Sequence, residues 1–425
     1  MLSVVEPKVS ARELIDSERV VTFFQPILCA RQRSIIGAEA LSRGVIGVEA
    51  LSRGTRDGRI DPANLIAPKD LFSMAADEGV TLALERLCRT TAVRSFAQMK
   101  RPEDLILFLN FNAAALEQDR DSMNDLLEQV RTNGLDPRSV AIEILESAFT
   151  DTEHLKGVME EFRDRGFLLV LDDIGAGHSN LDRIPMIKPD ILKLDRSMVH
   201  GIESDYHRQE TFKSLVLLSR RIGALTVAEG IENEEQAILA MEAGADLLQG
   251  FFLGRASEAS LFGQSDAPAR VDRLARNYKT HMIRRINLRK LQHRQFTIIQ
   301  NQILCDLGKS PTNDFERMLQ CTIGSYKNVE CVYVLDESGQ QITSTVCNPM
   351  LPLSNKGAMF RPAPKGADHS LKEYYYVLLD VELHKYTTDP YISLATGNLC
   401  RTISTCFRDS QLNKLYILCI DVLCE

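Results

Sequence analysis

The sequence lacks several features that would place it in other classes of protein. No run of apolar residues approaches the roughly 20 that a membrane-spanning helix needs. The N-terminal stretch MLSVVEPKVSARELI is too polar and too acidic for a secretory signal. The ten cysteines include no Cys-x-x-Cys pair, and only Cys29 and Cys88 precede residue 300. We therefore expect a cytoplasmic protein whose thiols are reduced and mostly buried.

An excess of positive charge is also absent. The chain has 50 Lys and Arg against 58 Asp and Glu, which gives a net charge of −8. This balance argues against a general nucleic-acid binder and against adhesion to acidic membranes. The rest of the composition, with 44% hydrophobic and 25% charged residues over 425 positions, is ordinary for a globular protein of two or three domains.

The stretch LLVLDDIGAG, from Leu168 to Gly177, is the centre of the interpretation. Its apolar residues predict a short buried strand, which ends in Asp172 and Asp173. Gly175 then permits a sharp turn. Successive residues of a regular strand point to opposite faces, but at a strand end that is already turning both carboxylates can reach one cation. An Asp-rich turn without a ligand is the alternative, and the motifs elsewhere in the chain favour a cation.

Strand and helix patterns alternate over about 240 residues of the chain. The expected strands lie at 20–27, 34–41, 105–112, 139–145, 168–173, 190–195, 224–230 and 245–253. Amphipathic helices are expected between most of them, including one helix over 69–98. This alternation predicts a parallel sheet covered by helices, and at this length a (β/α)8 barrel of the TIM type.

A tandem repeat interrupts the second of these strands. IGAEALSRGV, from Ile36 to Val45, is followed at once by IGVEALSRGT, from Ile46 to Thr55. The chain therefore offers two carboxylates, Glu39 and Glu49, for one place in the barrel. Because insertions are tolerated best in surface loops, we favour Glu39 in the strand, with the second copy in the loop that follows it.

Polar side chains recur where the expected strands end. They are Glu39 or Glu49, Asn110, Glu143, Asp172, Asp173, Lys193, Glu229 and Gln249. In a (β/α)8 barrel the carboxyl ends of the strands share one face, where active sites lie. A set of oxygen ligands without Cys or His predicts Mg²⁺ or Mn²⁺ rather than zinc. Lys193 is either the charge partner of these acids or a group that helps to deprotonate a water.

The pattern changes after about residue 262. Residues 267–308 lack strand signals and predict one long helix, basic in its first half, whose charged face we expect to be solvated. Residues 309–425 indicate an α+β domain with antiparallel hairpins: CVYVLDESGQQITSTV predicts two strands around a turn, and LYILCIDV predicts a last strand. The predicted parts are thus a barrel at 1–262, a helical linker at 263–308 and a second domain at 309–425.

Eight of these motifs, in order, resemble one known family. FFQPI, AEALSRG, FLNFN, AIEILES, LDDIGAGHSNL, ILKLD, VAEGIENEEQ and LLQGFF are similar to the EAL family of cyclic di-GMP phosphodiesterases over about residues 20–260. The resemblance implies a barrel that binds cyclic di-GMP and hydrolyses it to linear pGpG with two Mg²⁺ or Mn²⁺ ions. Residues 309–425 more weakly resemble the PAS-like or Cache-like regulatory domain of some EAL proteins, and a homodimer is expected.

The resemblance also implies a role for each motif residue. Glu39 or Glu49, Asn110, Glu143 and Asp172 would hold the first metal, and Asp172 and Asp173 would share the second. Lys193, Glu229 and Asp173 would act in catalysis, with Glu229 as the favoured base for the attacking water. The substrate contacts would be Gln25, Leu41, Arg43 or Arg53, and Gln249, and Glu146 would anchor the loop after Asp173. The alternative function is a receptor that binds cyclic di-GMP without cleaving it.

Overall fold

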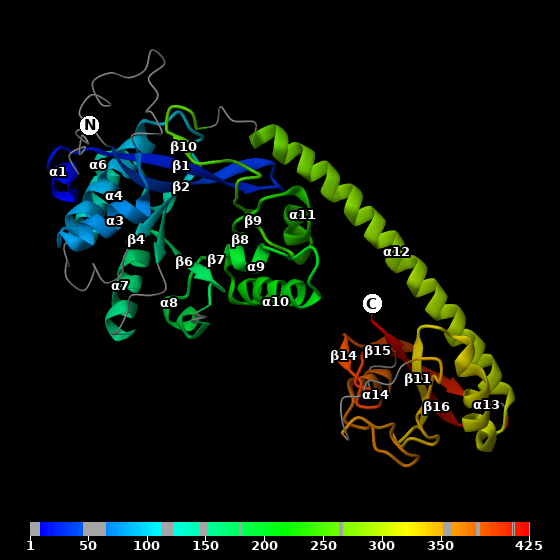
Figure 1. Ribbon diagram of the computed structural model, residues 1–425. Coiled ribbons are helices and arrows are strands. Elements are labelled where there is room, and N and C mark those ends of the chain that lie inside the picture. Colours follow the sequence, from blue (N-terminus) through cyan, green and yellow to red (C-terminus); the bar gives the residue numbers. More distant parts are fainter. Residues whose placement is uncertain are drawn as a thin grey trace, which may run out of the picture. The chain divides into compact units, whose positions relative to one another are not determined.

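The computed structural model (Figure 1) consists of two compact units, of which the first ends at Arg284 and the second begins at Arg285. It describes residues 9–45, 65–111, 122–144, 152–177, 181–262, 267–351, 359–379, 383–409, 411 and 413–424. The boundary between the units falls inside a long helix. The sequence-based division at 262 and 308 stays a prediction.

Eight strands of the first unit close into a barrel, which confirms the predicted fold. In order around the ring they are β1 (Val20–Cys29), β9 (Leu247–Leu248), β8 (Leu225–Ala228), β7 (Ile191–Leu194), β6 (Leu168–Ile174), β5 (Val140–Ile144), β4 (Ile106–Phe111) and β2 (Ser34–Val45). Neighbouring strands are parallel except at β1, which pairs antiparallel with β2 and with β9. A short turn, not a helix, connects β1 to β2, so the first strand runs against the others. The short strands β3 (Leu65–Ile66) and β10 (Ser257–Glu258) pair with β2 and β1.

Helices surround this barrel (Figure 1). They are α1 (Ala11–Asp16), α3 (Pro68–Asp77), α4 (Thr81–Gln98), α6 (Ser122–Thr132), α7 (Thr152–Asp164), α8 (Ile184–Ile187), α9 (Arg196–Val199), α10 (Tyr206–Ile222) and α11 (Glu234–Ala243). The prediction of one helix over 69–98 is wrong. Gly79 has a left-handed backbone (φ 67°), which separates α3 from α4 because glycine adopts this conformation without steric cost.

The second unit is built on an antiparallel sheet, as predicted. Its strand order is β12 (Val346–Cys347), β11 (Val329–Asp336), β16 (Leu415–Leu423), β15 (Leu399–Arg408) and β13 (Lys385–Thr387), and β14 (Tyr391–Ile392) also pairs with β15. The predicted hairpin is only partly formed, because its second arm is reduced to an isolated bridge at Gln341 and the two residues of β12. The helices of this part are α13 (Phe315–Thr322) and α14 (Glu373–Leu379). Whether the domain is related to PAS or Cache domains stays a prediction.

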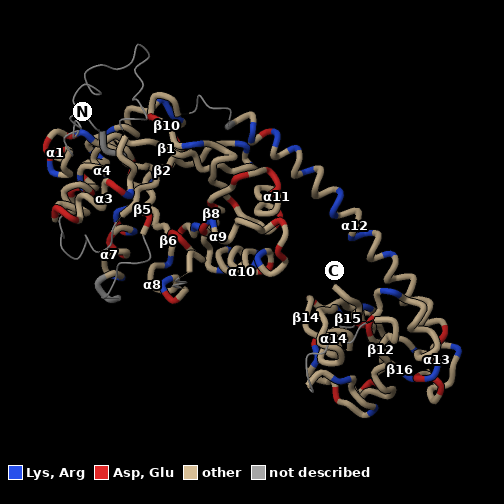
Figure 2. The backbone as a smooth tube through the Cα atoms, viewed as in Figure 1, with Lys and Arg blue, Asp and Glu red and all other residues tan. Residues whose placement is uncertain are grey.

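The long helix α12 (Ala267–Lys309) contributes to the cores of both units. Val271 and Leu274 are buried in the barrel core, whereas Ile303 and Leu307 are buried in the core of the second unit. Lys and Arg recur along the helix (Figure 2). Between the buried segments, Ile286 and Leu291 are exposed. The expected homodimer stays a prediction. Among the described residues, no helix is long and apolar enough to cross a membrane.

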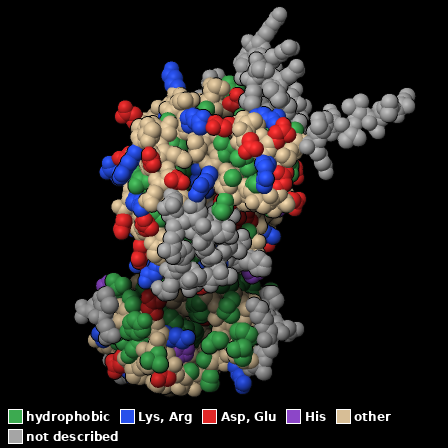
Figure 3. Space-filling view, turned by 90° about the vertical axis from the view of Figure 1, so that its left-hand side faces the viewer, with side chains coloured by type: hydrophobic (Ala, Val, Ile, Leu, Met, Phe, Trp, Pro, Cys, Tyr) green, Lys and Arg blue, Asp and Glu red, His purple; other side chains and the backbone are tan. Residues whose placement is uncertain are grey.

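One face of the second unit carries many hydrophobic side chains, which Figure 3 shows in green in its lower part. Leu371 is 93% exposed, and Tyr376, Ile392 and Leu394 are also exposed.

The interior of this unit contains a charged residue. Asp421 on β16 is buried and accepts a hydrogen bond from Thr402 Oγ1 at 2.7 Å.

We expect Asp421 to make the stability of the second unit depend on pH. Burial raises the pKa of its carboxyl from the ordinary 3.8 to about 7. Between about pH 4 and pH 7 the folded chain then holds a proton that the unfolded chain has lost, so stability falls as pH rises, by up to about 1.4 kcal/mol per pH unit, and levels off above pH 7. Asp421→Asn should remove this slope, whereas Asn in place of the exposed Asp389 should not. Urea unfolding at several pH values measures both, and an unchanged slope in Asp421→Asn would contradict the assignment.

Candidate functional site

The inner face of the barrel has an apolar layer and, above it, a polar one. Phe108, Ala141, Val170, Ile191, Val227 and Leu247 form one buried cluster, with one residue from each of six parallel strands. Two positions further along each strand the side chain points the same way, and these positions hold Asn110, Glu143, Asp172, Lys193, Glu229 and Gln249. On the reversed strand β1 the polar residue precedes the apolar one, so that Gln25 lies two positions before Ile27. The alternation of the strands thus places these polar residues at one end of the barrel.

Lys193 lies at the centre of the polar layer and is only 1% exposed. Its Nζ lies 2.6 Å from Glu229 Oε1 and 2.7 Å from Glu143 Oε1. It also lies 3.4 Å from Asp172 Oδ1 and 3.5 Å from Glu39 Oε2. One ammonium group therefore faces four carboxylates.

This imbalance of charge shifts the pKa values of the whole group. Burial raises the pKa of Glu143 and of Asp172, and raises that of Glu229 to about 8, although the Lys193 ammonium acts in the opposite direction on all three. Burial also opposes the charge of Lys193, but the surrounding carboxylates outweigh burial and raise the lysine pKa well above its usual range. Several buried acids with a single cation are costly unless further positive charge is bound.

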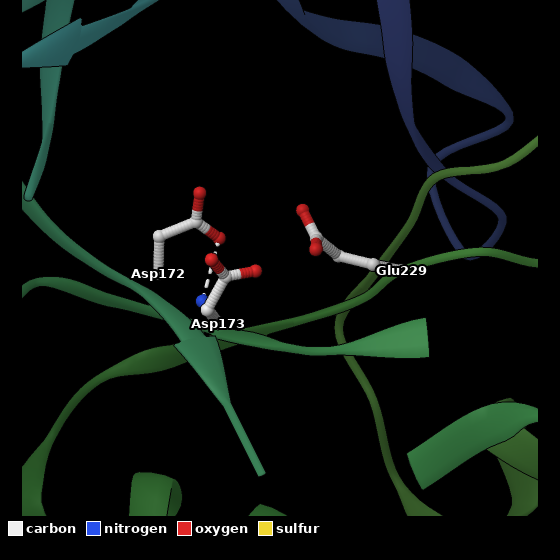
Figure 4. Close-up of side chains that lie close together, drawn as sticks. All are labelled: Asp172, Asp173 and Glu229. Atoms are coloured by element: carbon white, nitrogen blue, oxygen red, sulfur yellow. Dashed lines mark hydrogen bonds between the residues drawn. The ribbon is translucent and has the colours of Figure 1, made fainter. Parts of the chain in front are cut away.

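Three of the acids form a compact cluster. One carboxylate oxygen from each of Asp172, Asp173 and Glu229 can be chosen so that all lie within 4.8 Å of one another, and Figure 4 shows the three side chains facing a common space. Asp173 has a left-handed backbone (φ 57°), and its N–H donates to Asp172 Oδ1 at 2.9 Å. This turn in the backbone brings consecutive side chains to one side, as expected for the end of β6.

The donor set fits a hard divalent cation. Glu143 is completely buried, and its Oε1 pairs with Lys193, but its Oε2 accepts no hydrogen bond from any described residue. Such unsatisfied oxygens are rare in native proteins and point to an ion. All the donors are carboxylate or amide oxygens, which suits Mg²⁺ or Mn²⁺ rather than zinc.

Glu39 on β2 faces Lys193 from the other side of the ring closure and is held by two amide side chains. Gln249 Nε2 donates to Glu39 Oε2 at 2.5 Å, and Asn110 Nδ2 donates to Glu39 Oε1 at 3.4 Å. Gln25 lies opposite Glu39 in the β1–β2 register and donates to the Gly254 carbonyl at 3.2 Å.

The remaining predicted residues are placed only in part. Leu41 lines a separate cavity of about 400 Å³ beside Asn110. The backbone of Arg43 belongs to β2, but its side chain is not described. Glu49, Arg53 and Glu146 lie outside the described residues.

A cavity of about 290 Å³ opens over Asp172, Asp173 and Glu229, which we call the cation cluster. Its lining includes three residues that the sequence did not indicate as functional: Arg196, Glu232 and Phe251. Arg196 Nη2 pairs with Glu232 Oε1 at 2.7 Å, and Phe251 is 54% exposed. Arg196 directly follows the motif ILKLD, which was the one available signal for it.

Gly250 at the edge of this cavity has no room for a side chain. A Cβ atom there would lie 2.2 Å from the Ile231 carbonyl oxygen and 2.3 Å from its nitrogen. We expect Gly250→Ala to lower the free energy of unfolding by about 2 kcal/mol or more, because two backbone segments must separate.

Gly157 in α7 is the matched control, since nothing lies within 4 Å of the position of its Cβ. Gly157→Ala should raise stability by about 0.5–1 kcal/mol through helix propensity. Thermal unfolding of both variants tests the pair. If both substitutions changed the free energy of unfolding equally, the contact of the new Cβ with Ile231 would not be the cause of the loss in Gly250→Ala.

The chain is similar to known proteins over most of its length. A family model described as "EAL domain" matches residues 8–256. The chain is 26% identical over 401 residues, or 92% of each protein, to the uncharacterized EAL-domain containing protein YkuI of Bacillus subtilis. It is 26% identical over 243 residues to the cyclic di-GMP phosphodiesterase RocR of Pseudomonas aeruginosa, which is 57% of this chain and 58% of RocR. The B. subtilis signaling protein YkoW is much longer than this chain, which spans only 30% of it.

Solved structures share the fold. The crystal structure of B. subtilis YkuI in complex with cyclic di-GMP and calcium matches 98% of this chain and 100% of its own, with a TM-score of 0.78 and 24% identity. A manganese and cyclic di-GMP complex of Klebsiella pneumoniae BlrP1 matches 57% of each chain, with a TM-score of 0.50 and 24% identity. The first of these likenesses extends through the second unit.

Proposed function

Because the chain belongs to the EAL domain family, we propose that it binds cyclic di-GMP and hydrolyses one of its phosphodiester bonds to give linear pGpG. The observation that carries the proposal is the excess of buried carboxylates around Lys193, with Asp172, Asp173 and Glu229 within 4.8 Å of one another. Such a group needs cations, and a phosphodiester needs them too, because its own negative charge repels nucleophiles. When bound, two divalent cations would lower the pKa of a bound water and neutralise charge on the phosphate.

The proposed roles follow the positions of the side chains. Glu39, Asn110, Glu143 and Asp172 would hold the first ion, and Asp172 with Asp173 the second. Glu229 would accept the proton of the attacking water. Its raised pKa of about 8 describes the site without ions, and added positive charge would lower that pKa. Lys193, between Glu229 and Glu143, would orient that water and offset the charge of the acids.

The rim of the cavity offers contacts for the nucleotide itself. Phe251 is exposed beside the cation cluster, and an aromatic ring there could stack on a guanine base. The Arg255 guanidinium lies over one face of this ring, 4.5 Å from its centroid. Arg196 and Gln25 also face the cavity and could contact phosphate and base. This supports a nucleotide as substrate rather than a simple phosphate ester.

Incubation of the purified chain with cyclic di-GMP and Mg²⁺ or Mn²⁺, followed by chromatography of pGpG, tests the proposal. Product should appear with either ion and disappear when a chelator is added. Binding of cyclic di-GMP without product would overturn the hydrolase assignment in favour of a receptor. The second unit, as a regulatory domain, would change the rate and not the product.

The repeat in β2 gives a sharper test of the ligand set. Since Glu39 contacts Gln249 and lies 3.5 Å from Lys193, we expect Glu39→Ala to be nearly inactive. Glu49→Ala should retain near wild-type hydrolysis and change stability by less than about 0.5 kcal/mol. The reverse result, measured in the same pGpG assay, would assign the ligand to the second copy of the motif.

A further inference from the structure

Two cysteines of the second unit lie directly opposite each other on neighbouring strands. Cys331 in β11 pairs with Cys347 in β12 in the antiparallel register. The neighbouring residues Asn348 and Glu330 are hydrogen-bonded across the two strands, because the Asn348 N–H donates to the Glu330 carbonyl at 2.8 Å. In an antiparallel ladder hydrogen-bonded and non-hydrogen-bonded pairs alternate, so the backbones of Cys331 and Cys347 are not hydrogen-bonded to each other. In such pairs the Cα atoms are only about 4.5 Å apart, which lies within the range that a disulfide can span.

The side chains already meet. The two Sγ atoms are 2.8 Å apart, and both thiols are free. The short strand β12 is held in this register by Asn348, whose Nδ2 donates to the carbonyls of Tyr326 and Val329 at 2.9 Å each. Formation of a bond between the sulfurs would therefore need no shift in the pairing of the strands.

The two thiols differ in environment. Cys331 is completely buried, whereas Cys347 is partly exposed. A hydrogen bond from the Cys331 thiol lowers the pKa of Cys347, and the same contact, with burial, raises the pKa of Cys331. The nearby acids Glu330 and Asp421 raise both values. Cys347 is thus the more accessible and the more easily ionised of the two.

We propose that Cys331 and Cys347 are a two-thiol oxidation site, which a hydroperoxide converts reversibly into an intramolecular disulfide. The Cys347 thiolate attacks one oxygen of the hydroperoxide, and the O–O bond breaks. With hydrogen peroxide this leaves a sulfenic acid on Cys347 and, after protonation, one water. Cys331 then attacks the Cys347 sulfur, and its thiol proton leaves with the hydroxyl as a second water. In balance, two thiols and one hydrogen peroxide give one disulfide and two waters, and a dithiol reductant restores the pair.

The test uses the full chain, treated with hydrogen peroxide, alkylated, digested without reductant and analysed by mass spectrometry. A peptide that links Cys331 to Cys347 should appear in the wild type and vanish after dithiothreitol. It should be absent from Cys331→Ser and Cys347→Ser, but present in Cys419→Ser. That control removes a buried thiol of the same sheet, which lies opposite Ser404 rather than a cysteine. Modification of the exposed Cys305 and Cys321 verifies that the oxidant acted.

Calorimetry adds a measurement that does not depend on the variants. The disulfide would join positions 16 residues apart, and closing such a loop in the unfolded chain should raise the Tm of the oxidised wild type by about 4 °C or more. Dithiothreitol should reverse this shift. Modified Cys305 and Cys321 without the linked peptide, or the linked peptide only in protein unfolded by urea, would overturn the proposal.

Discussion

Glu229→Gln should lower the rate of cyclic di-GMP hydrolysis by about 10²–10⁴-fold while nucleotide binding stays within a few-fold of wild type. Glutamine keeps the size of the side chain and can still accept a hydrogen bond from Lys193, which lies 2.6 Å away, but it cannot accept the proton of a water. The loss should therefore fall on the chemical step. Single-turnover hydrolysis and equilibrium binding of the labelled nucleotide separate the two effects.

The geometry allows a second role for Glu229, because its carboxylate also belongs to the cation cluster. A lost ligand would weaken ion binding, so a higher Mn²⁺ concentration would restore much of the rate. A lost base would leave the rate low at every Mn²⁺ concentration. Glu160→Gln, at an exposed position of α7, is the control. More than a tenth of wild-type activity in Glu229→Gln at ordinary Mn²⁺ would place the base elsewhere.

Asp172→Asn should change stability and activity in opposite directions. Without ions, burial opposes the charge of the Asp172 carboxylate, and repulsion from Glu39 adds to this cost, although the Lys193 ammonium offsets part of it. We expect the amide to raise the free energy of unfolding of the ion-free protein by about 1 kcal/mol, because it keeps the shape and the acceptor for the Asp173 N–H. Activity should fall by roughly 10³-fold, and more completely than in Asp173→Asn, because Asp172 would serve both ions.

Denaturant unfolding in a chelator and calorimetric titration with Mn²⁺ measure the two effects. Asp182→Asn, at an exposed position, should change neither. A less stable ion-free Asp172→Asn would mean that attraction to Lys193 outweighs the combined cost of burial and of repulsion from Glu39. Full activity would remove Asp172 from the ligand set.

The sequence predicted the barrel and the polar layer well because both follow from strand periodicity. Val170 and Asp172, or Ile191 and Lys193, face the same way whatever the details of packing. Features that depend on contacts between distant parts of the chain were harder to predict from the sequence. Nothing local indicated that Phe251 would lie exposed beside the acids. Gly79, by contrast, was a local signal for the break between α3 and α4, which the prediction of one helix over 69–98 did not use. The close pairing of Cys331 with Cys347 depends on strand register, which their spacing alone does not specify.

The reversed first strand has a consequence for the order in which the protein folds. The ring closes where Leu28 of β1 pairs with Leu248 of β9, and two polar contacts bridge the same seam. Gln249 reaches Glu39 across 210 positions of sequence, and Gln25 reaches Gly254 across 229. Contacts this distant form late, because the chain between them must first be ordered.

During synthesis on the ribosome, the hairpin of β1 and β2 can therefore form early, but it has to wait for the last barrel strand. Until β9 has emerged, Glu39 lacks Gln249 and the acids of β5 and β6 lie in an open sheet. We therefore expect the cation site to be assembled in the final step of barrel folding. A nascent chain that ends before Leu247, the first residue of β9, would carry every acidic ligand and still lack the closed site.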